Sequence, residues 1–169
     1  VLNKELTRIL IDQQLQEAGW EADSQDITFQ KGARPEKGHY RAIAEWPTNH
    51  NGEKGRADYV LFAGLTPIAV VEAKKENTNV AGKIRQAERY SKGFKVEAPL
   101  VGAWELMGRT IAWPADESGH YHVPFVYSCN GRPYVPQLAE QSGTWFRDVR
   151  EPCNLRRALP QFHTPGGLL

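Results

Sequence analysis

Three residues of types that support metal-dependent hydrolysis lie close together in the sequence: Asp58, Glu72 and Lys74. Carboxylate oxygens are ligands that hard divalent cations such as Mg²⁺ prefer, and the backbone carbonyl of Ala73 could add another oxygen. A bound cation lowers the pKa of a water and offsets charge that develops on a phosphate. Lys74 could position or deprotonate the attacking water, or stabilise the transition state. These residue types therefore predict metal-dependent cleavage of phosphodiester bonds.

The stretch 55–75 predicts a β-hairpin that brings these side chains together. β-branched and aromatic residues fill two runs, and a turn centred on Gly64 separates them. With the turn centred on Gly64-Leu65, Asp58 lies opposite Val71 or Glu72 on the second strand. Because side chains alternate along a strand, Glu72 and Lys74 share one face. The hairpin thus gathers two carboxylates and one ammonium at one end of a sheet.

Residues 2–18 predict an amphipathic helix that ends at Gly19. Its expected inward stripe is Leu2, Leu6, Ile9, Leu10 and Gln13. Glu5, Arg8 and Asp12 lie along another stripe. Either these residues form a ladder of surface ion pairs, or Glu5 approaches the metal site from this helix.

A second helix is predicted over residues 79–92, with a cap at residues 77–79 and Gly93 as its stop. Its expected inward stripe is Val80, Ile84, Ala87, Tyr90 and Ser91. Gln86 and Tyr90 are four residues apart and so share a face. Both could orient DNA or the scissile phosphate, or Gln86 could simply satisfy the hydroxyl of a half-buried tyrosine. Between residues 74 and 95 there are seven Lys and Arg against two Glu. This run is either a solvated helix face or a surface that tracks phosphates.

Length and composition are typical of one soluble globular domain: 169 residues, 40% hydrophobic, 24% charged and a formal net charge of +1. No apolar run is long enough to cross a bilayer, and no signal-peptide pattern opens the chain. Cys129 and Cys153 are not spaced as zinc ligands, which favours free thiols in a reducing compartment. No GxxxxGKS or GxxxxGKT phosphate loop is present, so we expect any ATP-driven motor to lie outside this chain, within a longer protein.

The rest of the chain gives weaker signals. Short strands are expected at 27–29, 40–46 and 123–128, and a polar loop at 47–55. The stretch 94–122 could form an extra hairpin at the sheet edge.

Beyond Arg132 the chain is expected to be irregular. We assign residues 1–150 to one catalytic domain and residues 151–169 to a segment that leads towards a motor domain outside this chain.

Asp58 followed by the segment Glu72–Lys74 resembles the PD-(D/E)xK nuclease motif, with Ala57 where many members carry proline. Gln86 and Tyr90 resemble the QxxxY motif of one branch of that superfamily. The wider chain, most strongly over 1–20, 55–91 and 123–131, resembles the N-terminal nuclease domain of the R (motor) subunit of type I restriction enzymes.

The resemblance implies an α/β fold with a restriction-endonuclease-like (PD-(D/E)xK) core, in which helices flank a mixed central β-sheet. It implies an endodeoxyribonuclease in which Asp58, Glu72 and the Ala73 carbonyl bind Mg²⁺, for which Mn²⁺ substitutes. Lys74 acts on the water or the transition state, and the QxxxY pair positions the substrate. ATP is expected only for the motor domain outside the chain.

The implied partners are double-stranded DNA and the specificity and methyltransferase subunits of a type I complex, with no membrane, in a prokaryotic cytoplasm. Because no base-reading motif is visible, we expect cleavage without sequence preference. One alternative is another PD-(D/E)xK nuclease of resolvase or repair type. Another is a non-catalytic nuclease-fold module that docks or binds DNA, against which the intact Asp58, Glu72 and Lys74 count. In a purely structural interpretation, Glu72 and Lys74 form an exposed ion pair worth under about 1 kcal/mol.

Overall fold

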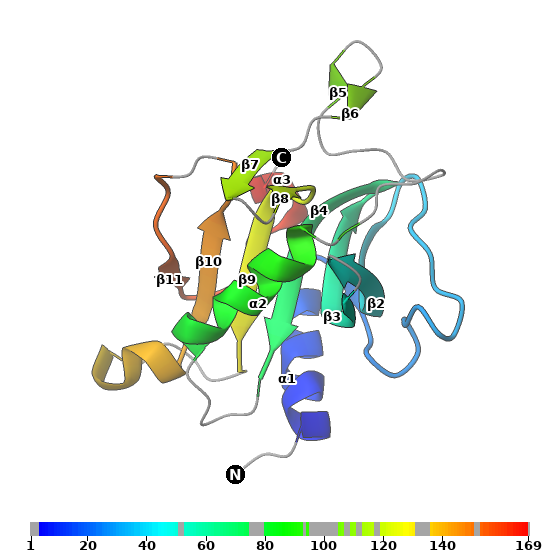
Figure 1. Ribbon diagram of the computed structural model, residues 1–169. Helices are drawn as coiled ribbons and strands as arrows, with labels where there is room; N and C mark the ends of the chain where they lie inside the picture. The colour runs from blue at the N-terminus through cyan, green and yellow to red at the C-terminus, as the bar shows by residue number, and fades with distance from the viewer. Residues whose placement is uncertain are drawn as a thin grey trace.

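A seven-stranded mixed β-sheet forms the centre of the computed structural model, with helix α1 (Lys4–Glu17) against one face and helix α2 (Val80–Lys92) against the other (Figure 1). The predicted α/β class, with two helices flanking a mixed sheet, is confirmed. No helix among the described residues is long and apolar enough to cross a membrane. The structure describes residues 4–50, 53–74, 80–92, 94, 105–106, 109–110, 113–116, 119–130, 136–150 and 153–168.

The strands of the sheet follow the order β1-β2-β3-β4-β9-β10-β11. The pairs β1/β2 and β4/β9 are parallel, and the other neighbours are antiparallel. Parallel strands need a long crossover between them, and α2 lies within the one that joins β4 to β9. The bounds are β1 (Glu21–Ala22), β2 (Tyr40–His50), β3 (Glu53–Ala63), β4 (Thr66–Ala73), β9 (Phe125–Cys129), β10 (Thr144–Asp148) and β11 (Arg157–Leu159).

The hairpin β3–β4 forms as the sequence predicted. The chain turns at Gly64, whose φ of 62° lies in the left-handed region that favours glycine. The ladder pairs Tyr59 with Val71, so Asp58 comes next to Glu72 at the end of the pairing. The two predicted acidic residues therefore meet at one end of the hairpin.

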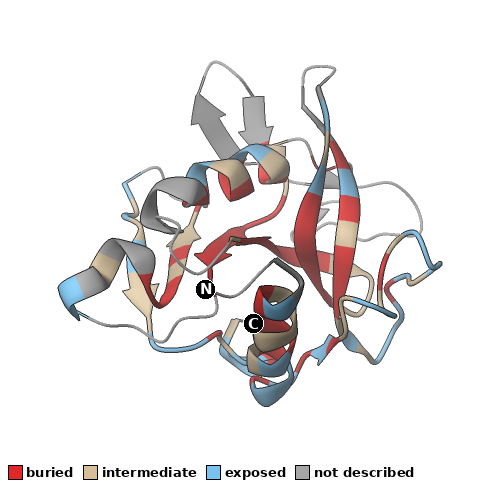
Figure 2. Cartoon of the chain, turned by 90° about the horizontal axis from the view of Figure 1, so that it is seen from below, coloured by how far each residue is buried: buried red, intermediate tan, exposed pale blue. Residues whose placement is uncertain are grey.

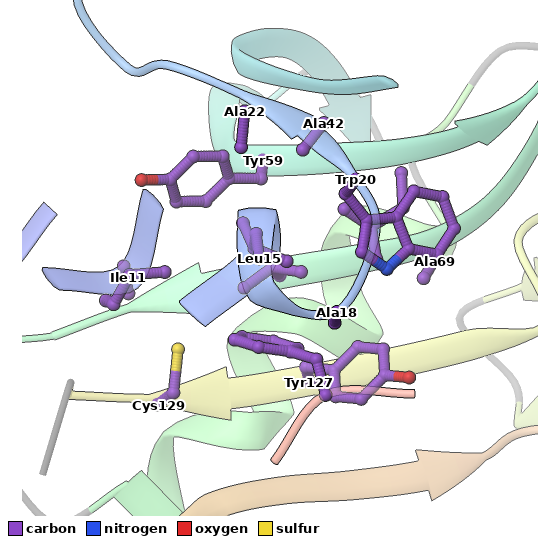
Figure 3. Packing of buried hydrophobic residues seen from close by; sticks show 14 of the residues in the cluster. Ile11, Leu15, Ala18, Trp20, Ala22, Ala42, Tyr59, Ala69, Tyr127 and Cys129 are labelled. Atoms are coloured by element: carbon purple, nitrogen blue, oxygen red, sulfur yellow. The ribbon is translucent and has the colours of Figure 1, made fainter. Parts of the chain in front are cut away.

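Helix α1 covers the sheet face that Tyr59 and Tyr127 share (Figure 3). It ends at Glu17, two residues before the predicted stop Gly19, whose φ is 100°. Its predicted inward stripe is wrong: Leu6 is 47% exposed, whereas Ile11 and Leu15 are fully buried. Apolar residues occur at adjacent positions in this helix, so several stripes fit its sequence, and the contact with the sheet selects the one through residues 7, 11, 15 and 18.

Helix α2 covers the opposite face of the sheet and begins at Val80, one residue after the predicted start. Of its predicted inward residues, Ile84, Ala87 and Ser91 are fully buried, whereas Tyr90 is half-buried. The helix cap predicted at residues 77–79 lies outside the described residues. Aromatic rings complete this second core, where Phe94 stacks on Trp46 at a ring-centroid distance of 6.1 Å.

The polar stretch 47–55, predicted as a loop, is instead part of a long hairpin: β2 runs to His50 and β3 starts at Glu53. Residues 47–50 and 53–55 therefore lie in paired strands despite their turn-forming residue types. Pro47 lies beyond the pairing of β2 with β1, so at this position β2 pairs with β3 and has no partner in β1. The strand predicted at 27–29 is reduced to one bridge between Thr28 and Ala44.

Within residues 94–122, the described parts form two small hairpins rather than an addition to the edge of the main sheet. They are β5 (Glu105–Leu106) with β6 (Arg109–Thr110), and β7 (Trp113–Asp116) with β8 (Gly119–Tyr121).

The chain beyond Arg132 is more regular than predicted. It contains the 3-10 helix η1 (Pro136–Gln141), strands β10 and β11, and helix α3 (Pro165–Leu168). Phe162 is buried in the α1-side core. Part of the segment assigned to a linker thus adds to the sheet and its core, while the domain boundary at residue 150 stays a prediction.

Candidate active site

Asp58 and Glu72 form a buried acidic pair where β3 and β4 cease to pair; they are 8% and 3% exposed. Asp58 Oδ2 accepts a hydrogen bond of 2.8 Å from the backbone N–H of Ala73. Lys74 Nζ lies 2.6 Å from Glu72 Oε1. The structure therefore brings together the three side chains singled out from the sequence. Because Glu72 is buried, an exposed ion pair at a strand end does not describe this contact.

The environment of Glu72 disfavours its charged form. Burial, followed by the negative charge of Asp58, raises the pKa of Glu72 to about 8, although Lys74 acts in the opposite direction. Glu72 Oε2 is buried and has no hydrogen-bond partner among the described residues. An unsatisfied buried oxygen of this kind is costly unless a ligand, an ion or water meets it.

Ser128 on β9 contributes a second unsatisfied oxygen beside Glu72. The two residues are paired in the parallel register of β4 and β9, so their side chains project on the same face. Ser128 is fully buried, and its Oγ also lacks a hydrogen-bond partner among the described residues. No motif in the sequence marked Ser128, because its position depends on a strand pairing across more than fifty residues.

Arg8 of α1 reaches the acidic pair from the other side of the sheet. Its Nη2 donates a hydrogen bond of 2.6 Å to Asp58 Oδ1, and its Nη1 lies 3.0 Å from Glu45 Oε1. Glu45 has a φ of 56°, which is uncommon for a residue other than glycine. Arg8 therefore links the Glu45 carboxylate to that of Asp58. Neither contact was predicted from the sequence.

The predicted surface ladder of ion pairs along α1 is therefore wrong for its described members. Arg8 binds residues of the sheet, and Asp12 accepts hydrogen bonds from the hydroxyl of Tyr59 at 2.6 Å and the backbone N–H of Ser24 at 2.9 Å. The side chain of Glu5 lies outside the described residues, so its approach to the site stays a prediction.

Gln86 and Tyr90 share a face of α2, as predicted, and Gln86 Nε2 donates a hydrogen bond of 2.8 Å to the Tyr90 hydroxyl. Burial raises the pKa of that hydroxyl, and the charges of Glu72 and Asp58 raise it further, so the ring lies within electrostatic reach of the acidic pair. This geometry is compatible with both predicted roles: Gln86 provides a hydrogen-bond partner for the tyrosine hydroxyl, and the two side chains could contact a substrate.

The oxygen atoms available for a cation come from Asp58 and Glu72. Among the described residues, no group of three or more His, Cys, Asp or Glu side chains could hold a metal ion. Mg²⁺ commonly binds to proteins through only one or two carboxylates and completes its shell with waters and substrate phosphates. The unsatisfied Glu72 Oε2 suits such a cation. The Ala73 carbonyl stays a predicted ligand, because Ala73 contacts Asp58 through its N–H.

Comparison with known proteins identifies the family. Residues 21–169 match the family model of the second domain of the type I restriction enzyme EcoKI endonuclease subunit. The chain is also 46% identical over 181 residues to the type I restriction enzyme EcoKI endonuclease subunit of Escherichia coli strain K12; the match covers 99% of this chain and 16% of that protein. No solved structure matches the chain. The match to a second domain refines the resemblance to an N-terminal one, and this chain belongs to the family of second domains of type I restriction enzyme endonuclease subunits.

Proposed function

We propose that this domain is a PD-(D/E)xK endonuclease that hydrolyses DNA phosphodiester bonds, with Asp58, Glu72 and Lys74 as its catalytic residues. The observation that carries the proposal is the buried acidic pair at the end of the β3–β4 hairpin, with one oxygen of Glu72 unsatisfied and Lys74 in contact with the other. Buried polar groups without partners are rare in folded proteins and indicate a functional site when they cluster.

Asp58 and Glu72 would hold the divalent cation, Mg²⁺ or Mn²⁺. When bound there, the cation would supply an activated water and offset negative charge on the phosphate. Its binding requires Glu72 in the charged form, which burial disfavours in the metal-free protein. Lys74 compensates part of that charge from 2.6 Å, so it holds Glu72 in place while presenting its ammonium group to the reacting phosphate.

The backbone and the neighbouring side chains keep Asp58 in a fixed orientation. The N–H of Ala73 and the guanidinium of Arg8 each donate to one carboxylate oxygen, at 2.8 and 2.6 Å. Each oxygen retains a lone pair for a cation. Tyr90, held by Gln86, lies near the acidic pair and would position the phosphate.

The relative is named as an endonuclease subunit of a type I restriction enzyme, and the present chain spans 16% of its length. By this relationship we infer that the domain works on double-stranded DNA beside an ATP-driven motor and with specificity and methyltransferase subunits. Cleavage without sequence preference follows, since sequence recognition would belong to the partner subunits.

The test uses the variant Lys74→Ala to separate metal binding from cleavage. The variant keeps both carboxylates, so it should still bind Mn²⁺ in calorimetry but should cut supercoiled plasmid at least about a hundredfold more slowly in Mg²⁺. The isosteric Asp58→Asn should lose both properties. Asp148→Asn, which alters a carboxylate paired with Arg150 elsewhere, is the matched control and should lose neither. Cleavage at the wild-type rate by Lys74→Ala or Asp58→Asn would contradict the proposal.

A further inference from the structure

The hairpin of β2 and β3 continues past the candidate active site as a two-stranded ribbon. Its pairing runs without a break from Trp46↔Ala57 to His50↔Glu53, whereas the pairing of β3 with β4 ends at Tyr59. Figure 2 shows these two strands projecting together beyond the rest of the sheet. At about 3.4 Å per residue, the ribbon extends about 14 Å past Ala57, which is the axial length of about four base pairs of DNA.

One face of the ribbon carries cations. Lys54 and Arg56 are exposed and alternate with Gly55 and Ala57, which are not. The Arg56 guanidinium lies 3.8 Å from Glu45, and its side chain is 57% exposed. Because Glu45 also binds Arg8, this face continues directly into the surroundings of Asp58.

The other face of the ribbon is fixed against α2. A Cβ atom at Gly55 would lie 3.0 Å from Tyr90 Cε1 and 3.4 Å from Thr48 Oγ1, so the absence of a side chain lets the tyrosine ring rest on the ribbon backbone. The helix that carries the substrate-positioning pair thus also sets the direction of the ribbon. Lys54 and Arg56 are therefore held in a defined place relative to the acidic pair.

We propose that the ribbon is an arm that binds the backbone of duplex DNA, with Arg56 and Lys54 contacting phosphates next to the one that reaches Asp58 and Glu72. This inference rests on the proposed function and adds the surface that receives the substrate. Arg56 lies two residues and Lys54 four residues from Asp58, about 7 and 14 Å along the strand. Measured along the axis of a duplex, at about 3.4 Å per base pair, these distances span about two and four base pairs.

The experiment measures duplex binding without cleavage. A fluorescent duplex of about 20 base pairs is titrated with the whole chain in EDTA, and fluorescence anisotropy is followed over a series of salt concentrations. Each lost phosphate contact lowers the slope of log affinity against log salt by about 0.9. Lys54→Ala/Arg56→Ala should therefore lower the slope by about 2 and weaken binding at low salt about tenfold or more.

The matched control is Lys31→Ala/Lys37→Ala, which removes two exposed cations from the loop before β2. Lys37 lies against Gly64, at the opposite end of the hairpin from Asp58, so this control should leave the slope nearly unchanged. Thermal unfolding of each variant verifies that the fold is intact.

Three results would each overturn the inference. The two double variants could have equal effects, the slope could be unchanged in the ribbon variant, or the wild-type chain could fail to bind duplex. The outcome is separable from that of the catalytic proposal. Binding in EDTA requires neither a bound metal nor cleavage, so a failure of the catalytic proposal leaves this measurement unaffected.

Discussion

Binding of a divalent cation should release a proton from Glu72, and the number of protons released per cation can be predicted. Burial and the charge of Asp58 raise the pKa of Glu72 to about 8 in the metal-free protein. At pH 7 about nine tenths of the molecules then carry a proton on Glu72, and at pH 9 about one tenth do. A carboxylate must lose its proton to bind a metal. We therefore expect release of about 0.9 proton per cation at pH 7 and about 0.1 at pH 9.

The assay is calorimetric titration of Mg²⁺ into the protein in pairs of buffers with different enthalpies of ionisation. The dependence of the observed enthalpy on the buffer gives the number of protons released. Affinity should also increase between pH 7 and pH 9 by about tenfold, because the proton no longer competes with the cation.

Glu72→Gln is the control, since it keeps the shape of the side chain but has no proton to release at any of these pH values. It should abolish the buffer dependence and weaken binding. Equal proton release at pH 7 and pH 9, or a release that persists in Glu72→Gln, would refute the assignment of the protonated site to this carboxyl group.

Three further predictions concern stability and the surroundings of the site. Because the folded state holds the Glu72 proton more tightly than the unfolded chain does, the unfolding free energy of the metal-free protein should fall as pH rises from about 4.5 to about 8; urea unfolding of Glu72→Gln should lack this component. Arg8→Gln should lower the unfolding free energy by about 2 kcal/mol, since it removes a charged donor from the buried Asp58, and an unchanged urea midpoint would show that the contact contributes nothing. Tyr90→Phe should lower the unfolding free energy by under about 1 kcal/mol while slowing cleavage. Gly55→Ala should lower it by about 1–3 kcal/mol, because the new Cβ would lie 3.0 Å from the Tyr90 ring. A larger loss of thermal stability in Tyr90→Phe than in Gly55→Ala would contradict this packing.

The local part of the site could be predicted because it depends on short-range rules. Turn residues around Gly64 set the hairpin, and strand alternation places Glu72 and Lys74 on one face beside Asp58. Helical spacing likewise places Gln86 next to Tyr90. Each of these relations spans fewer than twenty residues and requires no knowledge of how the elements pack.

The long-range part could not be predicted in the same way. Arg8 meets Asp58 across fifty residues, and Ser128 meets Glu72 through a parallel pairing that the hairpin does not determine. The inward stripe of α1 was wrong because its apolar residues permit several faces, and the sheet selects one. The ribbon was not predicted because the polar residues of 47–55 are of types common in turns. Its backbone pairing instead continues the antiparallel pairing of β2 with β3.

The most direct test of the central claim is a calorimetric titration of Mn²⁺ into the wild-type chain, Asp58→Asn and Glu72→Gln, each with and without a short duplex. We expect a binding site in the wild type that both substitutions abolish, with Asp148→Asn unaffected. The duplex should tighten that site, because phosphate oxygens can complete the shell of the cation. A wild type that binds no metal even with duplex present, or a site that survives both substitutions, would contradict the assignment of Asp58 and Glu72 as the metal-binding pair of a nuclease.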